Sequence, residues 1–427
     1  MASTYLTRTF ATNSNRKKFT VSVWVKKSQF ASGKAIWGSD DGSGYVWLLS
    51  GATIYFQQNP SNSIEFGSNA KLRDLNGWYH IVQQVDTAQA TASNRMKFWI
   101  NGEQITSWEQ ETYPSQNSDL NFTSSSEPIQ IGMYGNAYWD GSMSHFHWCD
   151  GYAYEASDFG QYDANGVWTI KTSPSVTYGT NGFFILKDGN SVTDQSGNSN
   201  NFTVAGGTLT NTEDNPSNVF ATLNPLVNNA GEMMALTKGN LTCESTTTSP
   251  AWKLAVSTLG MSSGKYYWEV KFDNVHNCYN TGVLGSNILV ANTTNPMNQT
   301  GYTGFYNTDG GEIRKDNVVT TADYGTYSTG DIMGVACDMD NYTITFYKNG
   351  VAHVSDVALS TTGRDMVFPC SIHYQTNGGV QASYNFGNGY FGTTAISSAG
   401  TNASGNGIFE YDVPTGYTAL STKGLNL

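Results

Sequence analysis

The 427-residue chain is long enough to form two or three domains with substantial hydrophobic cores. Only 13% of its residues are charged, while Gly (45) and Tyr (25) are abundant; this composition suits twisted sheets with many turns and argues against helical bundles and coiled coils. The 13% of aromatic residues argues against disorder, and a net charge of −12 lacks the positive field that nucleic acid requires. We therefore expect no nucleic-acid partner.

Strand patterns fill residues 1–210, the first predicted domain. In 19–28, Phe19, Val21, Val23 and Val25 alternate with Trp24, which predicts a strand with one buried face. In 140–154, a second alternation predicts Met143, His145, His147 and Cys149 on the face opposite Phe146 and Trp148. Further strands are expected at 45–49, 53–57, 78–85, 96–100, 129–133, 183–187 and 201–204.

Residues 211–226 are rich in Pro and Asn and predict a linker, with Phe220 and Leu223 as candidates for fixing it to a neighbouring domain. The second predicted domain, 227–395, contains the stretch 331–356, which predicts three strands joined by two tight turns. The second of these turns is Asn349-Gly350, the dipeptide best able to adopt φ > 0 at both positions of a type I′ hairpin. Asn101-Gly102 repeats it in the first domain, and residues 396–427 predict a C-terminal strand or docked arm.

Five cysteines form an odd, widely spaced set without a Cys-x-x-Cys pair, which argues against a disulfide framework or a structural zinc site. They are Cys149, Cys243, Cys278, Cys337 and Cys370. The pattern indicates folding in a reducing cytoplasm. The N-terminal stretch lacks the apolar segment of a secretion signal and no run reaches membrane-spanning length, so we expect no membrane insertion.

Four stretches of the first domain resemble the concanavalin A-like/laminin G-like jelly roll: FTVSVWVKKS (19–28), NGWYHIVQQVD (76–86), KFWINGEQIT (97–106) and YWDGSMSHFHWCDG (138–151). The stretch DQSGNSNNFT (194–203) departs from the resemblance, because a similar motif often opens such domains. Four stretches of the second domain resemble the SPRY domain: KYYWEVKF (265–272), GDIMGVACDMDNYTITFYKNGV (330–351), FPCSIH (368–373) and YNFGNGYF (384–391). The resemblance implies an all-β chain of two antiparallel, jelly-roll-like β-sandwich domains in tandem, with a short C-terminal arm.

The domain pair, together with NVFATLNPL (218–226) and YDVPTGYTAL (411–420), resembles virion proteins of tailed bacteriophages, of the tail or head fibre, spike or decoration type. This resemblance implies a location on the particle surface after assembly in the host cytoplasm. It also implies other virion structural proteins as partners and a symmetric homo-oligomer, a trimer by analogy.

The jelly roll also hosts retaining glucanases, whose catalytic residues follow a recognisable sequence pattern. Their Glu-x-Asp-x-Glu strand, which places two carboxylates on one face, does not occur; Glu410-Tyr411-Asp412 is the nearest arrangement and lacks the second Glu. His-Glu-x-x-His and P-loop motifs are also absent from the sequence. The prediction is a protein without enzymatic activity.

Metal-binding candidates are few. His145 and His147 are predicted on one strand face and could in principle chelate a metal, but semi-buried packing is the favoured interpretation. Laminin G-like domains often hold calcium through loop oxygens, which makes Asp86 and Asp140 candidate calcium ligands; a structural turn is the favoured alternative for each. No other cofactor is expected.

Glycan binding requires an exposed aromatic ring that stacks on a sugar, beside groups that hydrogen-bond its hydroxyls. Five aromatic residues stand in loop-like stretches and are the predicted binding residues: Tyr134, Tyr138, Trp139, Tyr324 and Tyr327. The loops expected to face a ligand are 134–140, 286–300 and 324–329.

These observations lead to one main hypothesis and two alternatives. The main hypothesis is a non-enzymatic phage virion appendage that mediates adhesion to a host-surface glycan or protein through exposed loops of its two sandwich domains. The alternatives are a purely structural capsid or tail subunit without receptor binding, and a glycan-degrading enzyme.

Overall fold

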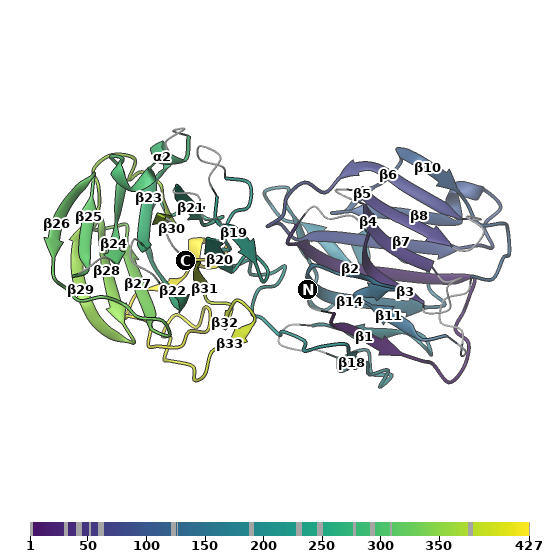
Figure 1. The fold of residues 1–427 in the computed structure, drawn as a ribbon. Helices are drawn as coiled ribbons and strands as arrows, with labels where there is room; N and C mark the ends of the chain where they lie inside the picture. The colour runs from purple at the N-terminus through teal and green to yellow at the C-terminus, as the bar shows by residue number, and fades with distance from the viewer. Residues whose placement is uncertain are drawn as a thin grey trace. The chain divides into compact units, whose positions relative to one another are not determined.

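The computed structural model describes residues 3–29, 33–39, 45–50, 53–58, 64–120, 125, 127–187, 192–227, 233–245, 251–275, 279–290, 295–307, 310–374 and 379–426. Its contacts divide the chain into two compact units. Unit 1 comprises Met1–Asn211 with Asn215–Ser217, and unit 2 comprises Thr212–Asp214 with Asn218–Leu427. Each unit is an antiparallel β-sandwich, so the predicted all-β class is confirmed (Figure 1).

Unit 1 consists of two packed sheets, here called the β1 sheet and the β2 sheet. In spatial order the β1 sheet contains β10 (Trp108–Thr112), β6 (Glu65–Lys71), β5 (Thr53–Gln58), β4 (Tyr45–Ser50), β3 (Lys34–Ser39), β11 (Ile129–Ile131), β1 (Tyr5–Arg8) and β18 (Thr203–Ala205). The β2 sheet contains β17 (Phe183–Ile185), β14 (Gly141–Asp150), β2 (Lys18–Lys27), β7 (Tyr79–Asp86), β8 (Met96–Ile100) and β9 (Glu103–Gln104). Smaller elements are η1 (Ala92–Asn94), β12 (Met133–Tyr134), β13 (Ala137–Tyr138), α1 (Ala156–Phe159), β15 (Gly160–Tyr162) and β16 (Trp168–Ile170).

Side-chain alternation assembles the core of unit 1. Val21, Val23 and Val25 of β2 lie in the core between the two sheets. Trp24 points to the other face of the β2 sheet, where its ring stacks on that of His80 at 4.8 Å. The predicted two-faced strand at 19–28 is therefore confirmed.

The alternation predicted in 140–154 is broken by a β-bulge. The register of β14 against β2 shifts between Ser144 and His147, and His145 lies in the left-handed region at φ 49°. An extra residue inverts the faces of all residues before it. His147 and Cys149 consequently lie opposite Trp148, as expected, whereas Met143 packs against the inner core instead. The prediction that placed Met143 beside His147 and Cys149 is therefore wrong.

Unit 2 is also a two-sheet sandwich, made of a β22 sheet and a β23 sheet. The β22 sheet contains β19 (Ala235–Thr237), β20 (Thr242–Ser245), β31 (Val380–Asn385), β22 (Lys265–Asn274), β27 (Ile332–Asp338), β28 (Thr343–Lys348) and β29 (Val351–Ala358), with β34 (Thr418–Ala419) parallel to β22. The β23 sheet contains β21 (Trp252–Val256), β30 (Val367–Tyr374), β23 (Tyr279–Gly285), β24 (Tyr302–Asn307), β25 (Glu312–Lys315) and β26 (Val318–Ala322). Smaller elements are α2 (Ser286–Val290), η2 (Pro296–Asn298), β32 (Tyr390–Phe391), β33 (Thr394–Ala395) and η3 (Gly424–Asn426).

Trp268, Val270 and Phe272 of β22 lie in the core between the sheets of unit 2, while Tyr267 faces outward. The chain before and after the sandwich covers this outer face. Phe220 comes from the predicted linker, and Phe409, Val413 and Ala419 come from the C-terminal stretch; all four pack in one cluster with Tyr267 and Ala336. Residues 396–426 are called the C-terminal arm below.

Two further features concern the described residues alone. None of the helices in these ranges is long and apolar enough to cross a bilayer. Cys149, Cys243, Cys337 and Cys370 are buried free thiols, and Cys278 lies outside the described residues.

The two Asn-Gly hairpins have the same construction. Both residues of each turn have positive φ: 49° and 83° at Asn101 and Gly102, 48° and 80° at Asn349 and Gly350. In unit 1 the Asn101 N–H donates to the His80 carbonyl (2.9 Å), and the His80 N–H donates to Asn101 Oδ1 (2.8 Å). In unit 2 Asn349 makes the same pair of bonds with Ile332, at 2.9 and 2.8 Å. The predicted type I′ turns are confirmed.

Substitution of Gly350 tests how unit 2 depends on its turn. A Cβ at Gly350 would lie 2.6 Å from the Tyr411 ring, in addition to the strain of φ +80°. We expect Gly350→Ala to lower the free energy of unfolding of unit 2 by about 2–4 kcal/mol. Urea-dependent hydrogen exchange of β22 and β27 amides in the full chain measures it.

Gly330→Ala is the matched control, because Gly330 also has positive φ (+95°) but, among the described residues other than its chain neighbours, no heavy atom lies within 4 Å of its Cβ position. Backbone strain alone should cost about 1–2 kcal/mol there. Equal losses at Gly350 and Gly330 would contradict a role for the Tyr411 contact.

Candidate functional site

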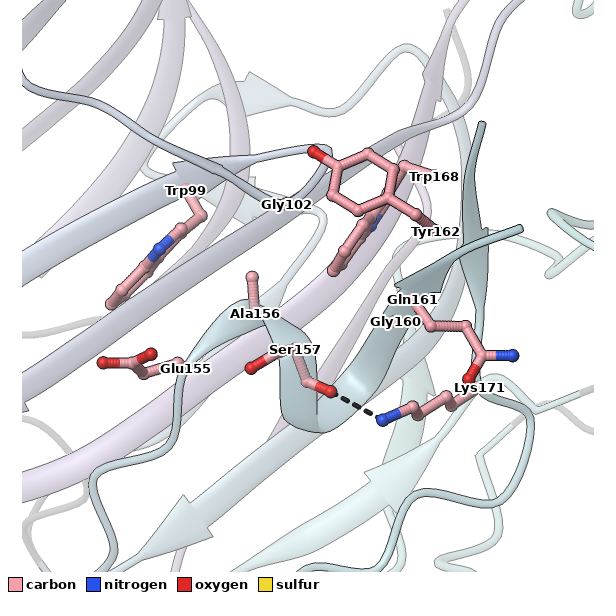
Figure 2. A pocket seen from close by; sticks show the side chains of 10 residues that line it. All are labelled: Trp99, Gly102, Glu155, Ala156, Ser157, Gly160, Gln161, Tyr162, Trp168 and Lys171. Carbon is pink, nitrogen blue, oxygen red and sulfur yellow. Dashed lines mark hydrogen bonds between the residues drawn. The ribbon is translucent and has the colours of Figure 1, made fainter. Parts of the chain in front are cut away.

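A pocket of unit 1 lies on the outer face of the β2 sheet, where the segment after β14 packs against β7 and β8. Figure 2 shows the side chains that line it. Its cavity volume is about 450 Å³. Aromatic rings, polar side chains and glycines line it: Trp99, Gly102, Glu155, Ala156, Ser157, Gly160, Gln161, Tyr162, Trp168 and Lys171. We call it the Trp168 pocket.

Two glycines make room for the Trp168 indole. A Cβ at Gly102 would lie 2.4 Å from Trp168 Cε3, and a Cβ at Gly160 would lie 2.5 Å from Cζ2. Real Cβ atoms do not approach other atoms this closely. Any residue other than glycine at position 102 or 160 would therefore displace the indole. Gly102 is the second residue of the unit 1 Asn-Gly turn, and its positive φ independently favours glycine.

A buried histidine fixes the indole from below. Trp168 Nε1–H donates to His80 Nδ1 at 3.0 Å, and the two rings stack at 5.9 Å. Because the indole is only a donor, His80 Nδ1 must be the acceptor, so the proton lies on Nε2, 2.8 Å from Ser22 Oγ. Burial, and to a smaller extent His145, lowers the pKa of His80 to about 3. The ring therefore stays neutral at physiological pH and keeps its acceptor nitrogen.

Ser22 and His80 resemble the nucleophile and base of a hydrolase, but they cannot serve as one. Both residues are completely buried, and the second ring nitrogen of His80 is occupied by the indole. A base with a pKa near 3 also has little affinity for a proton at neutral pH. The pair acts as a support for Trp168.

Tyr162 is the accessible ring of the pocket, with 48% of its surface exposed. It lies edge-on to Trp168 at 4.9 Å, and its hydroxyl donates to the Glu103 carboxylate. This hydrogen bond is the main reason why the pKa of Tyr162 is raised. The bond connects β15 to β9 and orients a ring that is otherwise open to solvent.

Polar groups complete the lining. Lys171 Nζ donates to the Ser157 carbonyl at 2.7 Å, which holds β16 against α1 (Figure 2). Glu155 and Gln161 are exposed, and they line the same pocket as the buried Trp99. Fixed aromatic faces beside polar side chains suit a ligand with both apolar C–H faces and hydroxyl groups.

The predicted binding residues lie elsewhere. Tyr134 and Tyr138 are half-buried on the β12–β13 hairpin, where Tyr138 packs on Tyr5 at 6.3 Å. Trp139 packs against the inner core of unit 1. In unit 2, Tyr324 is half-buried against the core. The structure brings none of these four rings into the Trp168 pocket.

Tyr327 was predicted as an exposed binding residue, and this placement is wrong. Its ring is only 2% exposed and packs between Phe272 and Phe305, at 5.2 and 5.1 Å. Its N–H donates to Asn307 Oδ1, and its hydroxyl donates to the Tyr347 carbonyl. A segment that looks like a loop in sequence thus contributes a core residue, and burial raises the pKa of Tyr327.

The calcium candidates stabilise turns and strand ends. Asp86 accepts hydrogen bonds from Ala88 N–H and the Gln89 amide, and pairs with Lys18 at 3.2 Å. Asp140 accepts from Ser28 Oγ at 2.6 Å and from the Gln29 amide. Within the described ranges, no three His, Cys, Asp or Glu side chains form a group that could hold a metal ion.

The two candidate metal-binding histidines pack among aromatic rings. His147 stacks on Phe184 at 4.0 Å, and its Nδ1 lies 2.9 Å from the Tyr178 hydroxyl. Burial lowers the pKa of His147 well below its ordinary value. His145 lies at the bulge, with its ring 2.7 Å from Ser144 Oγ.

The glucanase-like residues also have structural partners. Glu410 accepts hydrogen bonds from the Ser397 N–H and hydroxyl, and Asp412 accepts from those of Thr401. Both carboxylates therefore join two parts of the C-terminal arm.

Sequence reasoning missed the residues of the Trp168 pocket. One signal could have found them: the stretch 160–170 carries its own Asn-Gly pair, Asn165-Gly166, between Tyr162 and Trp168. Such a pair predicts a hairpin with two aromatic residues on its arms, which the structure forms as β15 and β16.

Comparison with known families agrees with this architecture. Residues 2–156 match the model of the concanavalin A-like lectin/glucanases superfamily, and residues 265–388 match the SPRY domain. The chain contains a concanavalin A-like domain followed by a SPRY domain. The first match ends at Ala156, the first residue of α1. Most residues that line the Trp168 pocket, from Ser157 to Lys171, follow this match in the sequence.

Similar solved structures include two SPRY-type domains and stonustoxin. The SPRY domain of human HERC1 is 19% identical, with a TM-score of 0.30, and the match covers 38% of this chain and 96% of that domain. The TRIM65 PSpry domain is 13% identical (TM-score 0.31; 39% and 88% covered), and stonustoxin is 20% identical (TM-score 0.30; 39% and 27% covered). No curated protein matches the chain.

The buried state of His80 predicts the acid sensitivity of unit 1. Between pH 6.5 and about 3, the unfolded chain binds a proton at His80 that the folded unit does not. The stability that the neutral His80 side chain contributes to folded unit 1 is complete above pH 6.5. It is lost as the pH falls below 6.5, by up to about 1.4 kcal/mol per pH unit. Urea unfolding of unit 1 at a series of pH values should show this dependence of the free energy of unfolding on pH. In His80→Asn the slope should be smaller by about 1.4 kcal/mol per pH unit, the equivalent of one proton.

His353→Asn, in unit 2, should leave the slope of unit 1 unchanged. An unchanged slope in His80→Asn would mean that His80 is protonated in the folded protein.

Proposed function

We propose that the chain is a non-enzymatic adhesion protein that binds a host-surface glycan at the Trp168 pocket. The observation that carries this proposal is the fixed indole: two glycines and the neutral His80 hold Trp168 beside the exposed ring of Tyr162. A pyranose offers an apolar C–H face to such rings, and its hydroxyls can bond to Glu155, Gln161 and Ser157. A site fixed before binding loses little conformational entropy when the ligand arrives.

The domain composition supports a binding role at a coarser level. One domain belongs to a superfamily that unites lectins and glucanases, and the other is a SPRY domain. The lectin-like alternative is favoured here because the sequence lacks the Glu-x-Asp-x-Glu strand and because the Ser22–His80 pair is inaccessible.

The proposal includes a location on a bacteriophage particle, as part of a fibre, spike or decoration. Its support is the resemblance of the stretches 218–226 and 411–420 to phage virion proteins. Partners in this setting are other virion structural proteins and further copies of the chain, a trimer by analogy.

Glycan binding is tested with the full chain on a glycan array, followed by titration calorimetry of the ligands found. Trp168→Ala should weaken binding by roughly tenfold or more, since a stacked ring contributes on the order of 1.5 kcal/mol. Gly160→Ala should have a similar effect without removing any ligand contact, because its Cβ displaces the indole.

Tyr152→Ala is the matched control. Tyr152 is an exposed aromatic on the same segment but does not line the pocket, so its loss should leave affinity unchanged. Absence of binding by the unmodified chain would favour the purely structural alternative. Release of reducing ends from a bound polysaccharide would favour the enzymatic one.

The location is tested by mass spectrometry and cryo-electron microscopy of phage particles whose genome encodes the chain. We expect the protein in purified particles, with density for two β-sandwiches on the outer surface. Its absence from such particles would contradict the virion assignment.

A further inference from the structure

A buried carboxylate of unit 2 holds the C-terminal arm. Glu269, on the outward-facing side of β22, is 0% exposed. Its Oε2 accepts the N–H of Glu410 and its Oε1 accepts the N–H of Tyr411, both at 2.9 Å. One carboxylate therefore accepts hydrogen bonds from two successive backbone N–H groups of the arm.

Among the residues that the structure describes, the elements around Glu269 supply no cation that bonds to its carboxylate. On β22 its neighbour is the Tyr267 hydroxyl at 3.3 Å, and on β31 it is the Asn385 amide, also at 3.3 Å. The opposite residue on β27 is Gly334, which has no side chain. From the arm come the two amides and the Tyr411 ring, while the Glu410 carboxylate is bonded to Ser397.

Apolar packing surrounds the same contact. Phe409, directly before the two amides, is buried edge-on against Tyr267 at 5.0 Å. Tyr411, directly after the first of them, lies against the Asn-Gly turn at Gly350. Docking of the arm is thus what takes Glu269 out of water.

We propose that Glu269 is a proton-operated latch that ties docking of the C-terminal arm to pH. When the arm is docked, burial raises the pKa of Glu269 to about 7, and the hydrogen bonds from Glu410 and Tyr411 offset only part of this effect. When the arm is released, the carboxylate is hydrated and its pKa returns toward the ordinary 4.5. The docked state therefore binds the proton more tightly than the released state.

The direction of the coupling follows from this difference. Docking is firmest below pH 4.5, where Glu269 is protonated in both states, and it weakens as the pH rises through about 7. Tyr267 and Tyr411, whose pKa values are raised by burial, stay neutral throughout this range. Release would expose the apolar cluster around Phe220, Tyr267 and Ala336.

Hydrogen exchange of the two latch amides tests the proposal in the full-length chain. After correction for intrinsic exchange rates, the protection of Glu410 and Tyr411 N–H should fall about 70-fold between pH 5 and pH 8. Protection of core amides in β23 and β24 should not follow this step. Constant protection of the latch amides, or an equal loss in the core strands, would overturn the proposal.

Two variants assign the step to a residue. The Gln side chain of Glu269→Gln cannot ionise, so the change in amide protection between pH 5 and pH 8 should disappear. This holds even if the variant protects the arm amides more weakly or more strongly than the unmodified chain does. Glu410→Gln is the matched control, because it removes the neighbouring carboxylate of the arm while leaving the backbone N–H in place. Persistence of the pH step in Glu269→Gln, or its loss in Glu410→Gln, would overturn the assignment. If Glu269→Gln does not fold, a step that is absent from the unmodified chain, or lost in Glu410→Gln, would still overturn it, and a step present in both would support it.

Discussion

The positive-φ Asn-Gly turn is the constraint on which both units depend. Each turn does two things at once: its Asn side chain ties the end of one strand to a residue near the start of the adjacent strand, and its Gly presents backbone without a Cβ. An aromatic ring lies against the bare glycine in each case, Trp168 at Gly102 and Tyr411 at Gly350. The turn that shapes the hairpin thus also defines where a later segment of the chain docks.

The two docking points differ in what surrounds the ring. At Gly102 the indole is supported by a neutral histidine from within the sheet, and the segment around it leaves an open pocket beside Tyr162. At Gly350 the arm continues across the sheet and buries Glu269 and Tyr267 beneath it. The same local device therefore yields a candidate binding site in unit 1 and a closed, covered face in unit 2.

Much of the fold could be predicted from the sequence, because alternation and turn chemistry are local. The strand at 19–28 and both Asn-Gly hairpins are examples. The bulge at Ser144–His147 was not predictable, since nothing in the local pattern of 140–154 signals an extra residue. Tyr327 shows the same limit: its burial depends on Asn307, Phe272 and Phe305, which are distant in sequence.

The candidate site was missed for a related reason. An indole becomes a fixed binding surface only when Gly102, Gly160 and His80, from three separate elements, meet around it, and no single stretch encodes that meeting. The match to the concanavalin A-like lectin/glucanases superfamily ends at residue 156. The segment that follows, with α1, β15 and β16, packs on the outer face of the β2 sheet, whereas the core of unit 1 lies on the inner face. Changes in residues such as Gln161 or Tyr162 can therefore alter what the pocket accepts without disturbing the packing between the two sheets.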